Sequence, residues 1–146
     1  MEKNRKELRT ISLLILVLVG FDMINRIINA CTNGLPKPTD IPADMSPATA
    51  EVITIVAFVL SFVLFLPQIY IAVKGLKIAK GAHSGKAPVI WAFILMVFAI
   101  IALIAAISNA TENFNHDTAF SLFETTLDIV TFAFFIVLAR KIAKEQ

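Results

Sequence analysis

Residues 88–107 read PVIWAFILMVFAIIALIAAI, and this stretch decides the fold class of the 146-residue chain. It contains no charged side chain, and roughly 20 apolar residues are what an α-helix needs to cross the hydrocarbon core of a bilayer. Because lipid offers the backbone no hydrogen-bonding partner, such a stretch must satisfy its own N–H and C=O groups as a helix. The stretch therefore predicts a transmembrane helix.

Three further apolar runs lie before and after this stretch, at residues 11–30, 52–73 and 119–139. The chain is 58% hydrophobic and only 16% charged, which is more apolar than a soluble domain of this length would bury. The alternation of polar and apolar residues expected of a membrane β-strand is absent. We therefore predict an all-α integral membrane protein, a four-helix bundle that forms a single domain over residues 1–146.

The lysines and arginines gather in three of the segments outside these runs, namely the N-terminus, the connection at residues 74–87 and the C-terminus. The loops at residues 31–51 and 108–118 carry acidic residues, and Lys37 is their one basic residue. Positive charge favours the cytoplasmic side of a membrane. We therefore expect both termini and the connection in the cytoplasm, the two loops outside, and four spans in antiparallel up-down order. The expected location is a bacterial inner (plasma) membrane.

The composition argues against several classes of function. The net charge of +2 arises from basic residues beside the predicted membrane, so no nucleic-acid role is expected. Cys31 is the single cysteine, and His83 and His116 fall on opposite sides of the membrane, so we expect neither a disulfide nor a metal site. The sequence has no nucleophile motif and no glycine-rich phosphate loop. We expect a protein that is not an enzyme, with no catalytic residues and no cofactor.

Charged residues inside the predicted membrane are the most informative feature for function. Asp22 and Arg26 lie four apart in the first span, and Glu124 and Asp128 lie four apart in the last, so each pair shares a helix face. Counted from the outer ends of the spans, Arg26 and Glu124 fall at similar depth, and Asp22 matches Asp128 one turn deeper. We therefore expect an intramembrane ionic face that joins the first and last helices.

Three interpretations of this ionic face remain open. Arg26 can hold the two helices in register through Asp22 and Glu124, as a structural lock. Alternatively, the three carboxylates outnumber the single guanidinium, so the face can hold a proton or a cation. The residues can also contact a partner protein.

Local signals predict the ends of several helices. Ser46 followed by Pro47 is typical of a helix start, and Gly81 of a helix end. Asp117 or Thr118 is expected to cap the last helix. Small residues also return near helical period in the third span, which permits the close approach of a neighbouring helix; they are Ala92, Ala99, Ala102 and Ala106.

Pro67 lies inside the second span, where it removes one backbone hydrogen bond and frees the carbonyl of Val63, so we predict a kink with Gln68 beside it. The run Phe65-Leu66-Pro67-Gln68, followed by a Lys-rich connection, an apolar helix with Trp91 and a further helix, resembles the PQ-loop and SWEET-type sugar transporters over residues 53–143. This resemblance implies a three-helix unit with Pro67 as the hinge of alternating access and Gln68 in the inner gate. Residues 71–80 are similar to stretches in small uncharacterised bacterial four-helix membrane proteins, which implies no activity.

Two functions fit these observations. The first is a non-enzymatic membrane protein that acts by association in the lipid bilayer, as a homo-oligomer or as an accessory subunit of a membrane complex. The alternative is a small transporter or channel in which Asp22, Glu124 and Asp128 bind protons or cations.

Overall fold

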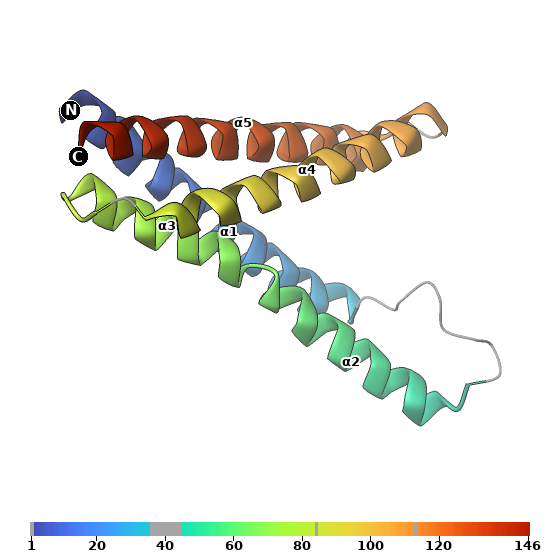
Figure 1. The fold of residues 1–146 in the computed structure, drawn as a ribbon. Coiled ribbons are helices and arrows are strands. Elements are labelled where there is room, and N and C mark those ends of the chain that lie inside the picture. Colours follow the sequence, from blue (N-terminus) through green and yellow to red (C-terminus); the bar gives the residue numbers. More distant parts are fainter. Residues whose placement is uncertain (1, 36–44, 84, 113) are drawn as a thin grey trace. The chain divides into compact units, whose positions relative to one another are not determined.

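The computed structural model describes residues 2–35, 45–83, 85–112 and 114–146, and nearly all of them are helical (Figure 1). Four of its helical segments are long and apolar enough to cross a membrane, which indicates a multi-pass membrane protein. The second segment consists of two helices separated by a short break. The helices are α1 (Glu2–Asn33), α2 (Pro47–Val63), α3 (Leu66–Ala79), α4 (Lys86–Glu112) and α5 (His116–Glu145).

Side chains and glycines end the helices where the backbone needs a partner. The side chain of Ser46 caps α2 by accepting from the Thr49 N–H at 3.3 Å, with Pro47 in the first turn, as predicted. Beyond α3, Gly81 has a φ of 103°. Its N–H donates to the Ile78 carbonyl and the Ala82 N–H donates to the Lys77 carbonyl, both at 3.0 Å. This is the Schellman arrangement, so the predicted stop at Gly81 is confirmed.

The prediction for the cap of α5 is wrong. Asn115, and not Asp117 or Thr118, is the N-cap, because its side-chain oxygen accepts from the Thr118 N–H at 2.9 Å. The same oxygen also accepts from the Thr118 hydroxyl at 2.7 Å. Asn115, Asp117 and Thr118 lie within four residues at the start of this helix, and each residue type can cap a helix, so only the backbone geometry decides among them.

The second span is interrupted near its middle, as Figure 1 shows between α2 and α3. The helix ends at Val63, and the Phe65 N–H donates to the Phe62 carbonyl at 3.1 Å in a tighter turn. Pro67 has no N–H to offer the carbonyl of Val63, which explains why the regular pattern stops here. The interruption of the helix expected at Pro67 is present, and Gln68 lies half-buried directly after it.

The chain divides into two compact units. Unit 1 is Met1–Leu16 with Pro67–Gln146, and unit 2 is Val17–Leu66. The first half of α1 therefore belongs to unit 1, and its second half belongs to unit 2 with α2.

A contact of three helices lies at the centre of unit 1. Ser12 of α1 is completely buried, and Gly75 of α3 lies so close to it that a Cβ atom on Gly75 would collide with the Ser12 hydroxyl. The same Cβ would lie 2.6 Å from Cε2 of Phe135 in α5, which is also fully buried. Glycine is thus required at position 75 by lack of space, because any side chain would force the helices apart.

Helix α4 packs along α5 within unit 1. Its buried residues are Pro88 and three alanines at every seventh position, Ala92, Ala99 and Ala106. The prediction that small residues allow a neighbouring helix to approach is supported for these three, whereas Ala102 is exposed. The side chains of α5 that are buried in this unit are large, Phe132, Phe135, Ile136, Leu138 and Ile142 among them.

Unit 2 buries few side chains. Val19, Thr54 and Phe65 are its buried residues among those described, and the Thr54 hydroxyl donates to the Ala50 carbonyl at 2.8 Å. By contrast, large apolar side chains of α2 such as Val59 and Leu60 are each 57% exposed. An apolar surface of this extent is stable in lipid, where it needs no protein cover.

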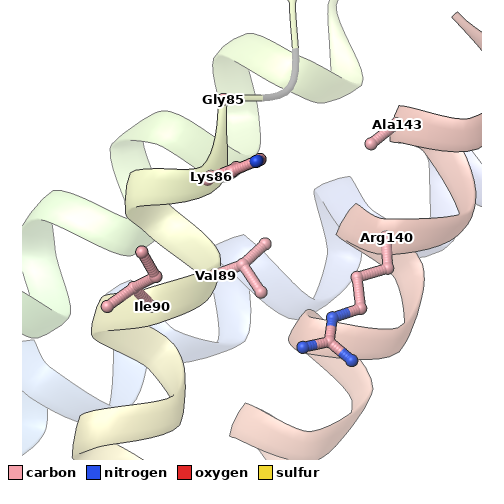
Figure 2. A pocket seen from close by; sticks show the side chains of 6 residues that line it. All are labelled: Gly85, Lys86, Val89, Ile90, Arg140 and Ala143. Atoms are coloured by element: carbon pink, nitrogen blue, oxygen red, sulfur yellow. The ribbon is translucent and has the colours of Figure 1, made fainter.

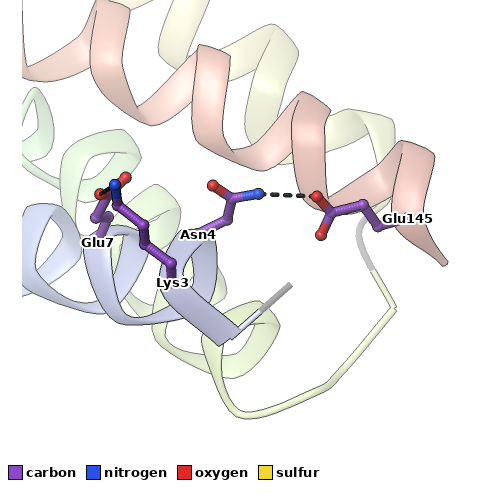
Figure 3. A network of polar contacts seen from close by, with 4 residues as sticks. All are labelled: Lys3, Asn4, Glu7 and Glu145. Carbon is purple, nitrogen blue, oxygen red and sulfur yellow. Dashed lines mark hydrogen bonds and ion pairs between the residues drawn. The ribbon is translucent and has the colours of Figure 1, made fainter.

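Polar contacts link the two ends of the chain within unit 1. The Asn4 side-chain amide donates to Glu145 Oε1 at 2.8 Å (Figure 3). Beside it, Lys3 Nζ lies 3.9 Å from Glu7 Oε1, one turn further along α1. The Gln146 side chain donates to the Ala82 carbonyl at 3.1 Å. The start of α1, the end of α5 and the turn after α3 therefore lie together at one end of unit 1.

Candidate functional site

Four polar residues, Asp22, Asn25, Arg26 and Asn29, lie on or beside one face of α1. This polar face of α1 belongs entirely to unit 2. Asp22 and Asn25 are half-buried, whereas Arg26 and Asn29 are exposed. Arg26 and Asp22 lie four residues apart, yet within the described part of the chain they form no ion pair. Instead, the Arg26 guanidinium carbon lies 5.1 Å from the centre of the Phe65 ring, a cation–π contact.

Phe65 places this contact at the break of the second span. Phe65 is only 4% exposed. Three rings before the break meet edge to face: the ring centres of Phe58 and Phe62 lie 5.1 Å apart, and those of Phe62 and Phe65 lie 6.1 Å apart. Sequence reasoning did not find the Arg26–Phe65 contact, because nothing in the spacing of the two residues signals it.

A pocket of about 490 Å³ opens beside Arg26 in unit 2. Asn29 and Asn33 supply amide groups on the same face of α1, and Phe58 of α2 supplies an apolar wall. The remaining lining residues are Ala30, Gly34 and Leu35. One cation and two amides beside an aromatic ring make a site that is polar on one wall and apolar on the other.

The acidic residues of α5 continue the face that α5 turns toward the core of unit 1. Phe135 contacts the Ser12–Gly75 site, Thr131 is buried one turn before it, and Asp128 and Glu124 lie half-buried at the next positions of that face. The Thr131 hydroxyl donates to the Leu127 carbonyl at 2.7 Å, so the helix itself satisfies it. The core face of α5 thus changes from apolar to acidic along its length.

The structure places the predicted site residues in two groups. Asp22 and Arg26 belong to unit 2, whereas Pro67 and Gln68 belong to unit 1, directly after the break of the second span. Glu124 and Asp128 belong to unit 1. That the faces of the first and last spans join remains a prediction from the sequence.

Metal ligands do not gather in the described residues, where no group of three or more His, Cys, Asp or Glu side chains can hold an ion. Cys31 is an exposed free thiol near the end of α1.

Basic residues from different segments form a second group. The sequence showed in which segments they lie, but not which of them lie together. Lys86 begins α4 and Arg140 lies near the end of α5, and both line a pocket of about 300 Å³ between these helices (Figure 2). A neighbouring pocket of about 210 Å³ is lined by Lys74, Lys77 and His83, and Gly85 belongs to both pockets. The signal that could have paired Lys86 with Arg140 is the short connection between α4 and α5, which predicts that the two helices run antiparallel. The start of α4, with Lys86, then lies beside the end of α5, with Arg140.

Comparisons with family models, curated proteins and solved structures found no match to this chain.

Proposed function

We propose that this chain is a four-span plasma-membrane protein of the bacterial inner-membrane type, non-enzymatic, with its spans antiparallel and both termini in the cytoplasm. The contacts Asn4–Glu145 and Gln146–Ala82 support one shared side for the two termini and the turn after α3. Of the chain's 13 lysines and arginines, all but Arg26 and Lys37 lie in the segments that meet there. Such an excess of positive charge favours the cytoplasmic side.

We further propose that the protein acts by association, with a second copy or with another membrane protein. The observation that carries this proposal is the exposure of Arg26 and Asn29 on a membrane span, beside the half-buried Asp22. A charged side chain costs about 2.5 to 3.5 kcal/mol at the centre of a bilayer on insertion scales, and less toward the surface, where Arg26 lies. A protein partner therefore favours this face more than lipid does. Association therefore runs through the polar face of α1.

The alanines of α4 do not support association, although their spacing in the sequence suggested it. Ala92, Ala99 and Ala106 are already buried within the chain, on a helix that packs along α5. A partner helix therefore cannot use this stripe without displacing the parts of this chain that already cover it. This leaves α1 and the exposed apolar side chains of α2 as the surface for a partner.

The test is the mass of the protein in mild detergent, measured by light scattering on a size-exclusion column and by native mass spectrometry. Association through α1 predicts a defined assembly that Asn29→Leu and Arg26→Gln shift toward the monomer. Glu51→Gln is the matched control, because Glu51 is exposed in the first turns of α2 and lies outside the polar face. A monodisperse monomer with no co-purifying partner, or equal behaviour of all three variants, would contradict the proposal.

A transporter or channel is the second candidate, and the break in the second span favours it. Interrupted membrane helices expose backbone groups that bind ions or substrates in many transporters. Here the break at Leu64 and Phe65 is followed by the half-buried Gln68. Asp22, Glu124 and Asp128, all half-buried on spans, would bind the proton or cation.

Flux of protons and cations into liposomes tests this candidate. Transport through the carboxylates predicts flux with the wild-type protein that falls strongly in Asp128→Asn and Asp22→Asn. Glu112→Gln serves as the control, because Glu112 is exposed at the end of α4. Absence of flux in the wild-type protein would remove this candidate and leave association.

A further inference from the structure

The groove between the first turn of α4 and the last turns of α5 has two different kinds of wall. Lys86 and Val89 lie on α4, Arg140 and Ala143 lie on α5, and all four face the space between the helices in Figure 2. Both cations are exposed, and Val89 is half-buried. The groove therefore offers two positive charges directly beside an apolar surface.

The start of α4 adds to the positive potential of this groove. The first N–H groups of a helix have no partner within the helix, and the helix dipole places partial positive charge at that end. Lys86 is the first residue of α4, so its backbone and its side chain both favour an anion there. On the far side of Gly85, Lys74 and Lys77 line the adjoining pocket and extend the positive charge.

We propose that this groove binds the phosphate group of an anionic phospholipid, with Lys86 and Arg140 on the phosphate and an acyl chain along Val89 and Ile90. The inference rests on the proposed membrane position of the chain, with this end at the cytoplasmic leaflet. Basic pockets between spans on that side are suited to anionic headgroups. A free phosphate would satisfy the cations but would leave the apolar wall unoccupied, whereas a phospholipid matches both walls.

The experiment measures lipid binding to the purified full-length protein in detergent, by native mass spectrometry with added phosphatidylglycerol or phosphatidylcholine. We expect phosphatidylglycerol to be retained in preference to phosphatidylcholine. Arg140→Gln and Lys86→Gln should each weaken retention by about fivefold, the effect of one basic residue beside an anionic headgroup. Lys141→Gln is the matched control, because it removes the same charge from the next residue of α5, which does not line the groove.

A steric variant separates this site from general attraction between charges. Ala143→Leu leaves every charge in place and fills the groove, so we expect it also to lower the retention of phosphatidylglycerol. Glycerol 3-phosphate in excess should not displace the lipid if the acyl chain contributes. Equal loss in Arg140→Gln and Lys141→Gln, or full displacement by glycerol 3-phosphate, would overturn the proposal. The binding measurement requires neither an assembly nor a known orientation, so its failure is distinct from failure of the proposed function.

Discussion

The guanidinium carbon of Arg26 lies 5.1 Å from the centre of the Phe65 ring, so the arginine of the first span contacts the aromatic side chain at the break of the second. The sequence suggested carboxylates as the partners of this arginine. An aromatic face instead provides a negative surface that remains uncharged, which suits a cation in an apolar setting. Within unit 2, the contact therefore ties α1 to the turn that ends α2.

A double-mutant cycle measures the interaction free energy between Arg26 and Phe65. Because Arg26 is exposed, we expect Arg26→Gln and Phe65→Leu to couple by about 0.5 to 1 kcal/mol in the free energy of unfolding in detergent. The cycle of Arg26→Gln with Phe114→Leu is the control, because Phe114 is exposed and lies outside unit 2. Additive effects of Arg26→Gln and Phe65→Leu would show that the contact contributes nothing.

Gly75→Ala should destabilise the protein, because the new Cβ would collide with the Ser12 hydroxyl and crowd the Phe135 ring. Alanine is favoured over glycine within a helix, so the comparison needs a glycine with free space. At Gly20 in α1, an added Cβ would meet no other side chain or helix within 4 Å. We expect Gly75→Ala to be less stable than Gly20→Ala by about 1 to 3 kcal/mol, the usual cost of overpacking, as measured by thermal unfolding.

The Ser12 hydroxyl provides a test of the cause. It is buried and has no hydrogen-bond partner in the described structure, so Ser12→Ala alone should cost little or stabilise the fold. In the Gly75→Ala background, Ser12→Ala should restore part of the lost stability by removing the colliding oxygen. If Gly75→Ala instead matches Gly20→Ala, the three helices do not meet as closely as the structure shows.

Gly81→Ala should lower stability through the backbone rather than through packing. The φ of 103° at Gly81 disfavours residues with a Cβ, whereas the nearest atom to such a Cβ, Arg5 Nη1, is 3.6 Å away at ordinary contact distance. We expect a loss of about 1 to 2 kcal/mol, measured by unfolding in detergent. Gly85→Ala, in open space without a positive φ, should be neutral, and equal losses at both positions would contradict this explanation.

Pro67→Ala should restore a regular helix through the second span. Residue 67 would regain an N–H that can donate to the Val63 carbonyl, so amide hydrogen exchange should slow at residues 64–68. The control is Pro47→Ala, because an N–H at the first residue of α2 has no partner within the helix. Unchanged exchange after Pro67→Ala would mean that other contacts keep the helix broken.

Cys31 allows the proposed orientation to be tested directly. It is an exposed free thiol close to the end of α1, so a membrane-impermeant maleimide should label it in intact cells if that end is outside. Ala82 is exposed in the turn after α3, and Ala82→Cys in a Cys31→Ser background should react only after the cells are permeabilised. The reverse pattern would invert the proposed topology.

The sequence predicted those parts of the fold that depend on local chemistry. Hydropathy identified the four apolar helical segments, and the residue types at Ser46, Gly81 and Pro67 identified two helix ends and the break in the second segment. These features are decided within a few residues of the backbone, so one sequence is enough to recognise them. The cap at Asn115 was missed for the opposite reason, since several neighbouring residues have the same capping chemistry.

Features that depend on distant residues were not predicted. Nothing near Arg26 in the sequence indicates Phe65, and nothing near Gly75 indicates Ser12 and Phe135. The division into two units within a continuous α1 also depends on which side chains meet across helices. For the candidate site, the sequence found which charges lie on spans, because a charge among apolar residues is visible without a structure. It could not show which neighbours those charges contact.

Ala92, Ala99 and Ala106 keep one line of α4 buried at every seventh residue. A repeat of seven residues corresponds to about 3.5 residues per turn, slightly fewer than the roughly 3.6 of a straight helix. Two helices that kept such a repeat in contact over many turns would wind around each other in a left-handed supercoil. Because these three side chains are single methyl groups, they leave room for a neighbouring helix to approach α4 closely at each turn where they lie.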